Sequence, residues 1–600
     1  IVVRGTAADD KLTIDFGEDF LAALDVRFDG GAGNDTLAMT GGSFDAVRLA
    51  TDTGLSGSIT AQAGALTHSI GLANVGAVED DTTASQRIYA DTSGQARVIR
   101  IGSSDDSNDG LSVLDAGTFN NLIAYKFATP TVSLTVDAGA GDDGFVLREI
   151  DPALAGRVVL SGGAGSDAVV GPPQDTDWHL TGDGSGDVAG VSFVTVENLI
   201  GSAGNEDTFF VGAAGKLSGV MAGGDAGFDS MVLDGGTFAS VKYAATGQTS
   251  GTITRDGVVL RYDGLEPIVD NSVVADRVIT TSNADDEATL TDNGATLTLS
   301  SDSLIPTFES ITFNKPSTSL TINLGDDLGI PIFSKDTLTI NAVNLSSTAL
   351  IINGQDGKDE VTISGALTAG AVTVNAEKIS VSSTINASSV TLTAAAADDG
   401  KITGGAYFAT PEAIIDLSGA TIIVTGAAQF TATATANVEA ETFEVGPLAG
   451  VIATILPEAR VKFSSTNVTA ASLSASSTVT VTLTAKDESD ASSDNDEKKD
   501  AAVSVTVLVS DAITEVLAGS VLSVSGAVSL TATSNLTMTT EADGGFRSQC
   551  DDPRQCLGRF DDWRECRRYA QFDRARRDAD QQHHDHRQVD SGRIGPKCRR

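Results

Sequence analysis

Five stretches in the first half of the chain recur in the same order farther along, and this internal repeat constrains the fold more than any other feature. GGAGNDTLAMTGGSF from Gly30 matches GDAGFDSMVLDGGTF from Gly224. RVIRIGSSDD from Arg97 matches RVITTSNADD from Arg277, and the five offsets lie between 180 and 194 residues. Chance similarity between glycine turns would not keep one order. The sequence therefore predicts a duplicated unit within an elongated array.

Both copies of the unit consist of short apolar or alternating runs bounded by Gly, Asp and Asn, a pattern of strand, turn, strand. After Val361 the acidic turns thin out, and ISGALTA, GAVTVNA, GAAQFTA and GAVSLTA recur. Very short strands with one or two inward apolar side chains are what the stacked coils of a parallel β-helix need. We predict an all-β, elongated parallel β-helix or β-solenoid. Its parts are a first acidic unit (1–214), a second, duplicated unit (215–362), an Ala/Thr/Val/Ser-rich β-helix (363–545) and a tail (546–600).

The tail differs abruptly in composition from the rest. All four cysteines lie in it, and its Arg residues are interleaved with Asp. A zinc site is not favoured because no C-x-x-C pair occurs. A shifted reading frame fits better: His and Asp codons read one base later give Thr, and Arg codons give Ala, which restores the preceding composition. We expect a disordered tail without function.

The charge balance narrows the possible partners. Lys and Arg number 39 against 81 Asp and Glu, a formal net charge of −42. A surface this negative repels nucleic acid and attracts cations. No apolar run is long enough to span a membrane, so we expect no membrane insertion of the visible chain. The start IVVRGTAADD has neither Met nor a leader, which indicates an internal piece of a longer, exported protein.

Acidic glycine turns are the motif that carries chemistry. They follow the nine-residue pattern G-G-x-G-x-D-x-U-x, in which U is apolar. The glycines permit positive φ, the Asp adds a charged oxygen, and the apolar residue begins the next strand. Two turns fit fully, from Gly30 and Gly162; three miss one Gly, from Ala138, from Gly224 (Asp225 in the second Gly place) and from Gly354 (Gln355 in that place).

These turns resemble the calcium-binding repeats of the RTX, or haemolysin-type, family. The resemblance implies a parallel β-roll in which each turn supplies half of a Ca²⁺ site and a stacked turn supplies the other half. VENLIGSAGNEDTFFVG and VRGTAADDKLTI look like diverged relatives of the same turn. The metal-site residues that the resemblance implies are Gly30, Gly31, Gly33, Asp35, Gly139, Gly141, Asp143, Gly162, Gly163, Gly165, Asp167, Asp229 and Asp359.

The spacing of the turns departs from that family, whose repeats follow one another every nine residues. Ala138 and Gly162 are 24 residues apart, close to one coil of a wider solenoid, so Asp143 and Asp167 can face each other across adjacent coils. The turn at Gly30 has no comparable neighbour. We favour calcium binding for the Ala138 and Gly162 turns, whereas a bare structural turn explains the others equally well.

The leading interpretation is a structural or adhesive calcium-binding segment of a large secreted or cell-surface bacterial protein, RTX-like at first and haemagglutinin-like later. Its partners would be calcium and host or cell-surface glycans or proteins. One alternative is an acidic spacer without metal. Another is a β-helix polysaccharide lyase or epimerase, which needs an acid or base in a groove. Trp178 and His179 are the one adjacent pair of that kind, and such a pair more often packs, so we expect no enzyme.

Overall fold

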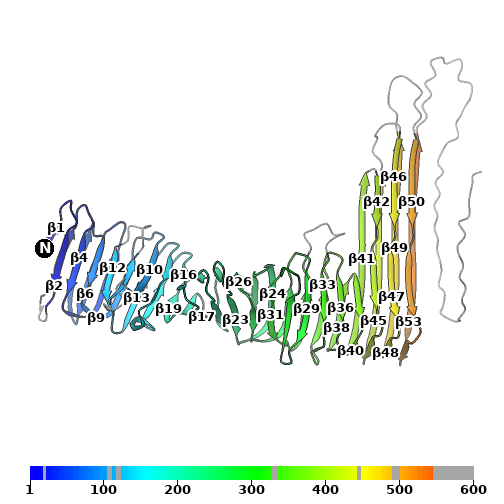
Figure 1. The fold of residues 1–600 in the computed structure, drawn as a ribbon, viewed down its shortest axis with the longest axis horizontal. Coiled ribbons are helices and arrows are strands. Elements are labelled where there is room, and N and C mark those ends of the chain that lie inside the picture. Colours follow the sequence, from blue (N-terminus) through cyan, green and yellow to red (C-terminus); the bar gives the residue numbers. More distant parts are fainter. Residues whose placement is uncertain are drawn as a thin grey trace, which may run out of the picture.

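The computed structural model describes residues 1–17, 22–103, 111–115, 123–326, 335–403, 405–441, 448–489 and 501–544. The sequence-predicted tail and its reading-frame interpretation lie outside these residues. The described chain is an all-β rod of stacked coils, as predicted (Figure 1). A single 3-10 turn, η1 (Pro152–Leu154), is the one helix found there. Across the same residues no helix is long and apolar enough to cross a membrane.

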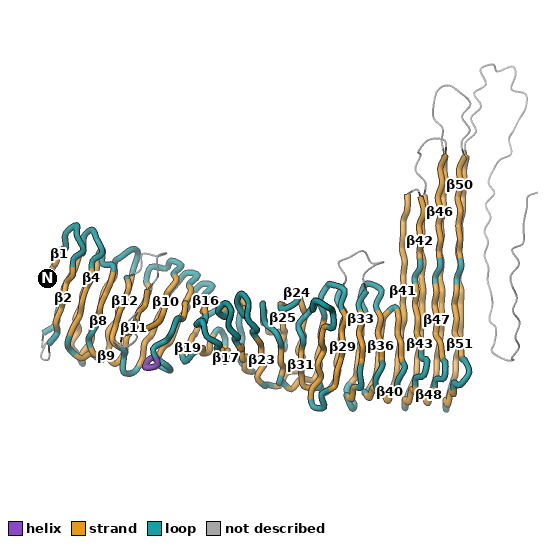
Figure 2. The backbone as a smooth tube through the Cα atoms, viewed as in Figure 1, coloured by secondary structure: helices purple, strands orange, loops and turns teal. Residues whose placement is uncertain are grey.

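Two long sheets run along the rod and enclose one continuous apolar core. Successive coils pair in parallel, and because side chains alternate along a strand, every second residue points inward. Orange strands and teal turns alternate along the rod in Figure 2. Sheet 1 contains β1 (Val2–Arg4), β3 (Asp25–Asp29), β5 (Ser43–Thr51), β6 (Gly57–Ala63), β7 (Leu66–Ala73), β9 (Thr83–Asp91), β13 (Ser133–Asp137), β15 (Val158–Ser161), β17 (Asp177–Gly182), β18 (Ser185–Val188), β19 (Val191–Val194), β21 (Thr208–Gly212), β23 (Ser230–Asp234), β27 (Ile268–Asp270), β29 (Glu287–Asp292), β30 (Thr296–Ser301), β31 (Ile311–Asn314), β33 (Thr337–Ile340), β36 (Glu360–Ile363), β39 (Lys378–Val381), β43 (Glu412–Asp416), β47 (Glu458–Phe463) and β51 (Asp511–Val516).

The second long sheet, sheet 2, faces sheet 1 across this core. It contains β2 (Lys11–Asp15), β4 (Thr36–Thr40), β8 (Ala77–Asp80), β10 (Val98–Ser103), β11 (Leu111–Asp115), β12 (Ala124–Ala128), β14 (Gly144–Leu147), β16 (Ala168–Val170), β20 (Asn198–Ile200), β22 (Val220–Ala222), β24 (Thr237–Gly247), β25 (Ser250–Arg255), β26 (Val258–Asp263), β28 (Val273–Thr280), β32 (Ser319–Asn323), β35 (Ala349–Asn353), β38 (Ala371–Ala376), β41 (Ser389–Thr403), β45 (Ala427–Glu441), β49 (Ser472–Ser489) and β53 (Val528–Gly544).

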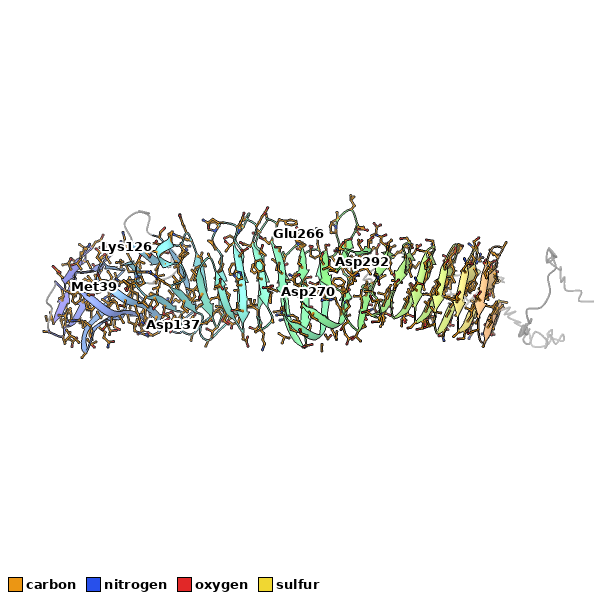
Figure 3. All side chains as sticks on the ribbon, turned by 90° about the horizontal axis from the view of Figure 1, so that it is seen from below. Met39, Lys126, Asp137, Glu266, Asp270 and Asp292 are labelled. Carbon is orange, nitrogen blue, oxygen red and sulfur yellow. The ribbon has the colours of Figure 1, made fainter. Side chains whose placement is uncertain are left out.

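Two smaller sheets enlarge the later coils. Sheet 3 adds a third side, and sheet 4 packs against the distal halves of the long strands β41, β45, β49 and β53. These distal halves and sheet 4 project from the rod as a two-layered wing (Figure 1). Figure 3, turned by 90°, shows side chains along the whole rod. Sheet 3 contains β34 (Val343–Asn344), β37 (Leu367–Thr368), β40 (Thr384–Ala387), β44 (Thr421–Val424), β48 (Asn467–Ala470) and β52 (Val521–Val524), and sheet 4 contains β42 (Gly405–Ala409), β46 (Leu448–Ile455) and β50 (Ala501–Leu508).

The duplicated unit enters the rod twice with its two sheets exchanged. We call edge one the side where the chain passes from sheet 1 to sheet 2, and edge two the side where it returns. The turn at Gly30 joins β3 of sheet 1 to β4 of sheet 2, whereas its counterpart joins β22 of sheet 2 to β23 of sheet 1. The meander β5–β6–β7 lies in sheet 1, and the matching meander β24–β25–β26 lies in sheet 2. The acidic turns therefore occupy edge one as far as residue 197 and edge two between residues 171 and 377.

One stretch of the sequence alignment was wrong. Arg277 corresponds to Arg87 rather than to Arg97, because Arg87 and Arg277 each pair, fully buried, with an Asp seven residues earlier, Asp80 and Asp270. Arg97 instead donates from Nε to Asp91 inside an acidic turn. The similar strings RVIRI and RVITT hid this register, and the corrected offset, 190, falls among the other offsets.

Candidate cation-binding turns

Asp143 and Asp167 lie in adjacent coils at edge one, where the spacing of 24 residues predicted them. The Asp143 N–H donates to Asp167 Oδ1 at 2.8 Å, and the Ser166 N–H donates back to Asp142 Oδ1 at 2.8 Å. Two carboxylates, one from each coil, thus hold the neighbouring turns together from both sides. We call this arrangement a carboxylate clasp.

A second clasp gives the Gly30 turn the neighbour that the sequence did not reveal. The turn that begins at Gly5 stacks on it, so that the Asp10 N–H donates to Asp35 Oδ1 and the Asn34 N–H donates to Asp9 Oδ1, both at 2.8 Å. The stretch VRGTAADDKLTI, which looked like a diverged relative of the motif, is this neighbour. The chain's first two coils are therefore joined in the same way as the coils of Asp143 and Asp167.

Two further clasps lie at edge two. The stretch VENLIGSAGNEDTFFVG, which holds Asp207, looked like a diverged relative of the turn, but no site residue in either clasp was predicted. Asp207 Oδ1 accepts from the Thr176 N–H at 3.0 Å, and Asp175 Oδ1 accepts from the Glu206 N–H at 2.9 Å. The second clasp at this edge joins the turn of Asp285 and Asp286 to the turn of Asp336. The paired acids in GDDG, ADDK and ADDE are the signal that could have identified three of the four clasps.

The predicted residues Asp229 and Asp359 continue the series of carboxylates along the edge, each of which accepts a backbone N–H from the preceding coil. Asp229 Oδ1 accepts from the Asp207 N–H at 2.7 Å, and Asp359 Oδ1 accepts from the Asp336 N–H at 3.1 Å. Two of these series end on a glutamate, at a coil whose turn is much shorter. Glu197 accepts from the Asp167 N–H, and Glu377 accepts from the Asp359 N–H. The longer glutamate side chain reaches the same backbone group from a tighter corner.

The glycines of these turns have two separate roles. The first leaves room for the carboxylate, since a Cβ at Gly30 or Gly162 would lie 2.5 Å from the Oδ2 of that turn's own Asp. The second and fourth positions take backbone angles that favour glycine. Their φ values are 98° at Gly31, 121° at Gly33, 86° at Gly139, 132° at Gly141, 99° at Gly163 and 146° at Gly165.

Two turns with a substituted glycine differ from each other. Gln355 does take the left-handed place of the second glycine, with φ of 76°. Asp225 does not: Gly223 provides the space for Asp229, Gly224 has φ of 111° and Gly227 has φ of 118°. This turn therefore keeps all its glycines and contains one extra residue, which shifted the sequence alignment by one position.

The second carboxylate oxygen of these side chains, Oδ2, is the atom available to bind a proton or a cation. Oδ2 of Asp35, Asp143 and Asp167 is buried and has no hydrogen-bond partner. Burial raises the pKa of Asp143 to about 6, and burial also raises the pKa of Asp167. A buried anionic oxygen without a partner favours a proton or a cation.

A cation here would depend on the backbone as well as on the carboxylates. Among the described residues no three His, Cys, Asp or Glu side chains converge as metal ligands. The stacked turns bring carbonyls close together, since a Cβ at Gly163 would lie 2.0 Å from the Gly139 carbonyl oxygen. One carboxylate oxygen per turn plus carbonyls is a donor set of oxygens only, which suits Ca²⁺.

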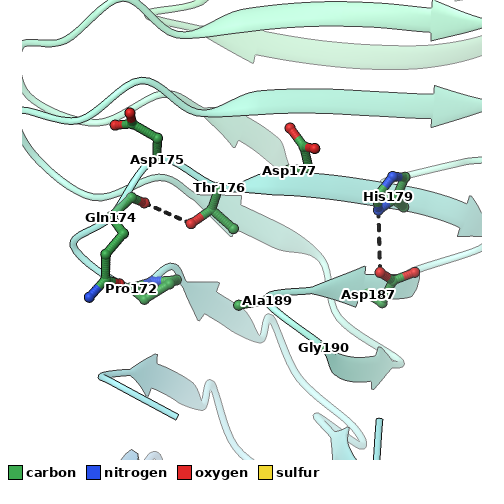
Figure 4. A pocket seen from close by; sticks show the side chains of 9 residues that line it. All are labelled: Pro172, Gln174, Asp175, Thr176, Asp177, His179, Asp187, Ala189 and Gly190. Atoms are coloured by element: carbon green, nitrogen blue, oxygen red, sulfur yellow. Dashed lines mark hydrogen bonds and ion pairs between the residues drawn. The ribbon is translucent and has the colours of Figure 1, made fainter. Parts of the chain in front are cut away.

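Trp178 and His179 point to opposite sides of β17. Trp178 is fully buried and stacks on Phe209, with ring centroids 5.2 Å apart, so it belongs to the core. His179 lies at an open hollow of about 440 Å³, where its Nδ1 is 3.2 Å from Asp187 Oδ1 (Figure 4). His179 also stacks on Phe210. The alternation of the strand separates the two side chains that an enzyme interpretation would bring together.

No protein family model matches the chain, and no curated protein matches it. The clasps and the unpartnered oxygens are therefore the observations that bear on the chemistry of the turns.

Proposed function

We propose that this chain is a structural, calcium-fastened segment of a large secreted or cell-surface adhesin. The observation that carries the proposal is the unpartnered Oδ2 of Asp35, Asp143 and Asp167 inside stacked glycine turns. These residues fit Ca²⁺, which prefers oxygen ligands, because each turn offers one unpartnered carboxylate oxygen next to backbone carbonyls. Bound calcium would neutralise the buried charge, while the protein's own Oδ1 atoms and backbone N–H groups keep adjacent turns in register.

The clasps also support the rod in the absence of metal, which is the alternative of an acidic spacer. In both cases the rod holds regions that bind host or cell-surface glycans or proteins away from the cell. The two cases differ in whether stability depends on calcium, since a ligand that binds only the folded state stabilises it by about 2.7 kcal/mol at a hundred times its Kd.

The test is thermal melting of the whole chain with calcium and with chelator, alongside the double variant Asp143→Asn/Asp167→Asn. We expect calcium to raise the Tm of the unaltered chain and to raise it less in the double variant. Asn keeps an acceptor oxygen for the backbone N–H, so the variant removes charge while preserving the clasp. The double variant Asp234→Asn/Asp511→Asn, at two exposed strand ends, is the charge-matched control. Equal melting with calcium and with chelator would leave the metal-free spacer.

A further inference from the structure

The dipeptide Asn–Gly occurs twice in the chain, at Asn293–Gly294 and at Asn353–Gly354. Because glycine has no Cβ, its backbone nitrogen can reach the side-chain amide of the preceding asparagine. Attack of this nitrogen on Cγ forms a five-membered imide, and the amide nitrogen leaves as ammonia with the proton that the glycine nitrogen gives up. Water then opens the imide at either carbonyl and yields aspartate or isoaspartate. The two pairs share this chemistry and differ in their surroundings.

The first pair lies at the open tip of a hairpin. β29 ends at Asp292 and β30 begins at Thr296, so Asn293 and Gly294 lie between the strands. Both residues are exposed, and a Cβ at Gly294 would meet nothing within 4 Å. Asn293 Nδ2 donates to Thr298 Oγ1 and the Gly294 N–H donates to Asp292 Oδ1, both at 2.8 Å. These hydrogen bonds stay within the hairpin, so the tip can bend into the imide geometry while adjacent coils remain paired.

The second pair is enclosed between coils. Asn353 is the last residue of β35, which pairs with β32 on one side and with β38 on the other. Its Nδ2 donates to Asn323 Oδ1 at 2.9 Å, and its Oδ1 accepts from Asn375 Nδ2 at 3.0 Å. The Gly354 N–H donates to the Asn375 carbonyl at 2.7 Å, and a Cβ at Gly354 would lie 2.6 Å from Asp359 Oδ2. The imide can form at this position only after the neighbouring coils separate.

We propose that Asn293 converts spontaneously to aspartate and isoaspartate in the folded rod, whereas Asn353, which has the same following residue, stays intact. The fold makes this selection, since the chemistry of the two Asn–Gly pairs is identical. Each conversion replaces a neutral amide by a carboxylate. Isoaspartate in addition places one more carbon atom in the backbone between residues 293 and 294.

The conversion has a structural consequence through Asp292. Oδ2 of Asp292 accepts from Lys315 Nζ at 2.7 Å and from the Asn344 N–H at 2.8 Å, and the second contact joins the hairpin to the following coil. Oδ1 is oriented by the Gly294 N–H, and the longer isoaspartyl backbone moves this donor away. The new carboxylate also repels Asp292, since both are negative. We expect the Asn344 N–H to lose protection against hydrogen exchange.

Peptide mapping by mass spectrometry, with fragmentation to locate each change, measures the conversion in the full chain aged at mildly alkaline pH. Asn293 should convert about tenfold faster than Asn353 or more, because Asn353 must first lose several hydrogen bonds between coils. The same chain unfolded in urea is the control, since both Asn–Gly pairs are then free and should convert at similar rates. Hydrogen exchange at the Asn344 N–H should be faster in the chain aged until most of Asn293 has converted than in fresh chain.

Asn293→Gln is the matched variant for the exchange measurement, because its longer side chain closes an imide far more slowly, and it should keep the Asn344 N–H protected after the same ageing. Three results would overturn the proposal. The first is an Asn293 that converts as slowly as Asn353 in the folded chain. The second is a difference that persists in urea, because the flanking sequence rather than the fold would then select the site. The third is an Asn344 N–H whose exchange on ageing is the same in the unaltered chain and in Asn293→Gln.

Discussion

At the scale of single residues, the two oxygens of each carboxylate in the acidic turns have different roles. In Asp35, Asp143 and Asp167, Oδ1 accepts a backbone N–H from the preceding coil, and Oδ2 is buried without a partner. In Asp35 and Asp167 this Oδ2 faces the first glycine of its own turn. The first oxygen sets the register of the coils, and the second makes the turn sensitive to protons and cations.

The two roles of the carboxylate oxygens predict that the Tm depends on pH. The direction of this dependence should be opposite in chelator and in excess calcium. Burial raises the pKa of Asp143 and of Asp207 to about 6, above the ordinary value for Asp of about 3.9. A raised pKa in the folded state stabilises the fold at low pH, and that stability is lost as pH rises through about 6. In chelator, the Tm should therefore fall between pH 5 and pH 7, and in excess calcium it should rise.

The double variant Asp143→Asn/Asp207→Asn isolates this effect, because both of its side chains stay uncharged across the range. His68, whose pKa is lowered by burial, acts in the opposite sense in both proteins and cancels in the difference. A Tm that depends equally on pH in both chains would contradict the assignment.

At the scale of elements, the stack of turns is tighter than its sequence suggests. A Cβ at Gly165 would lie 1.8 Å from the Gly141 carbonyl oxygen of the next coil, whereas a Cβ at Gly204 would meet nothing within 4 Å, although both residues have positive φ. Both φ values favour glycine, 146° at Gly165 and 78° at Gly204, and of the two residues Gly165 alone is in close contact with a neighbouring coil.

Gly165→Ala should therefore destabilise the rod more than Gly204→Ala does. Gly204→Ala should cost about 1–2 kcal/mol for the left-handed conformation alone. Gly165→Ala should cost clearly more, because the adjacent coil must move away. Hydrogen exchange of the amides in residues 138–170 gives the measurement, and equal protection in the two variants would show that the turns are not packed as described.

The buried Arg–Asp pairs show how the duplicated elements diverged. Tyr125 of β12 donates to Asp80 and accepts from Arg87, while Tyr243 of β24 makes the same two contacts with Asp270 and Arg277. The two tyrosines are not equivalent in the repeat: Tyr125 comes from the coil after the arginine strand and Tyr243 from the coil before it. The same Arg–Asp–Tyr hydrogen-bond network is therefore completed by the following coil in the first copy and by the preceding coil in the second.

Tyr125→Phe and Tyr243→Phe should consequently destabilise their coils by similar amounts, about 1–3 kcal/mol each, because each leaves a buried carboxylate short of one donor. Local hydrogen exchange in β8 and β9, or in β27 and β28, measures the loss. Tyr262→Phe, at a buried ring whose hydroxyl contacts neither pair, should cost less. A much smaller effect at Tyr243 would mean that Arg277 alone satisfies Oδ2 of Asp270, whose Oδ1 accepts from Ser272.

The sequence predicted the features that are fixed within a few residues of the chain, and it did not predict those that depend on contacts between coils. Glycine spacing and the Asp of each turn identified the turns at Gly30, Ala138 and Gly162, because both are fixed by the backbone within a few residues. The one-residue insertion before Asp229 and the stacking of Gly5 on Gly30 depend on contacts between coils. The wing was not predicted, since an alternating run such as TVTVTLT reads the same inside the rod and beyond it.

At the scale of the whole molecule, the rod is a one-dimensional stack whose stability is the sum of contacts between neighbouring coils. Its two copies of the duplicated unit meet where several strands are only three residues long, β16, β20, β22 and β27. Trp178, the largest fully buried side chain in the described residues, stacks on Phe209 within this segment. Removal of this one side chain should therefore leave a large cavity at the junction.

Trp178→Ala should cost about 3–5 kcal/mol and uncouple the two copies, so that calorimetry shows two transitions where the unaltered chain has fewer. Phe228→Ala, at a ring that is 56% exposed, should leave the calorimetric trace unchanged. A single, merely lowered transition in Trp178→Ala would show that the stack unfolds as one unit despite the short strands.

The exchange of sheets between the two copies also determines how the rod would respond mechanically. The acidic turns line edge one in the first copy and edge two in the second. If a cation drew adjacent turns closer, the first half would curve toward one side and the second half toward the other. The two bends would oppose each other, giving a shallow S-shaped rod whose ends still point in nearly the same direction.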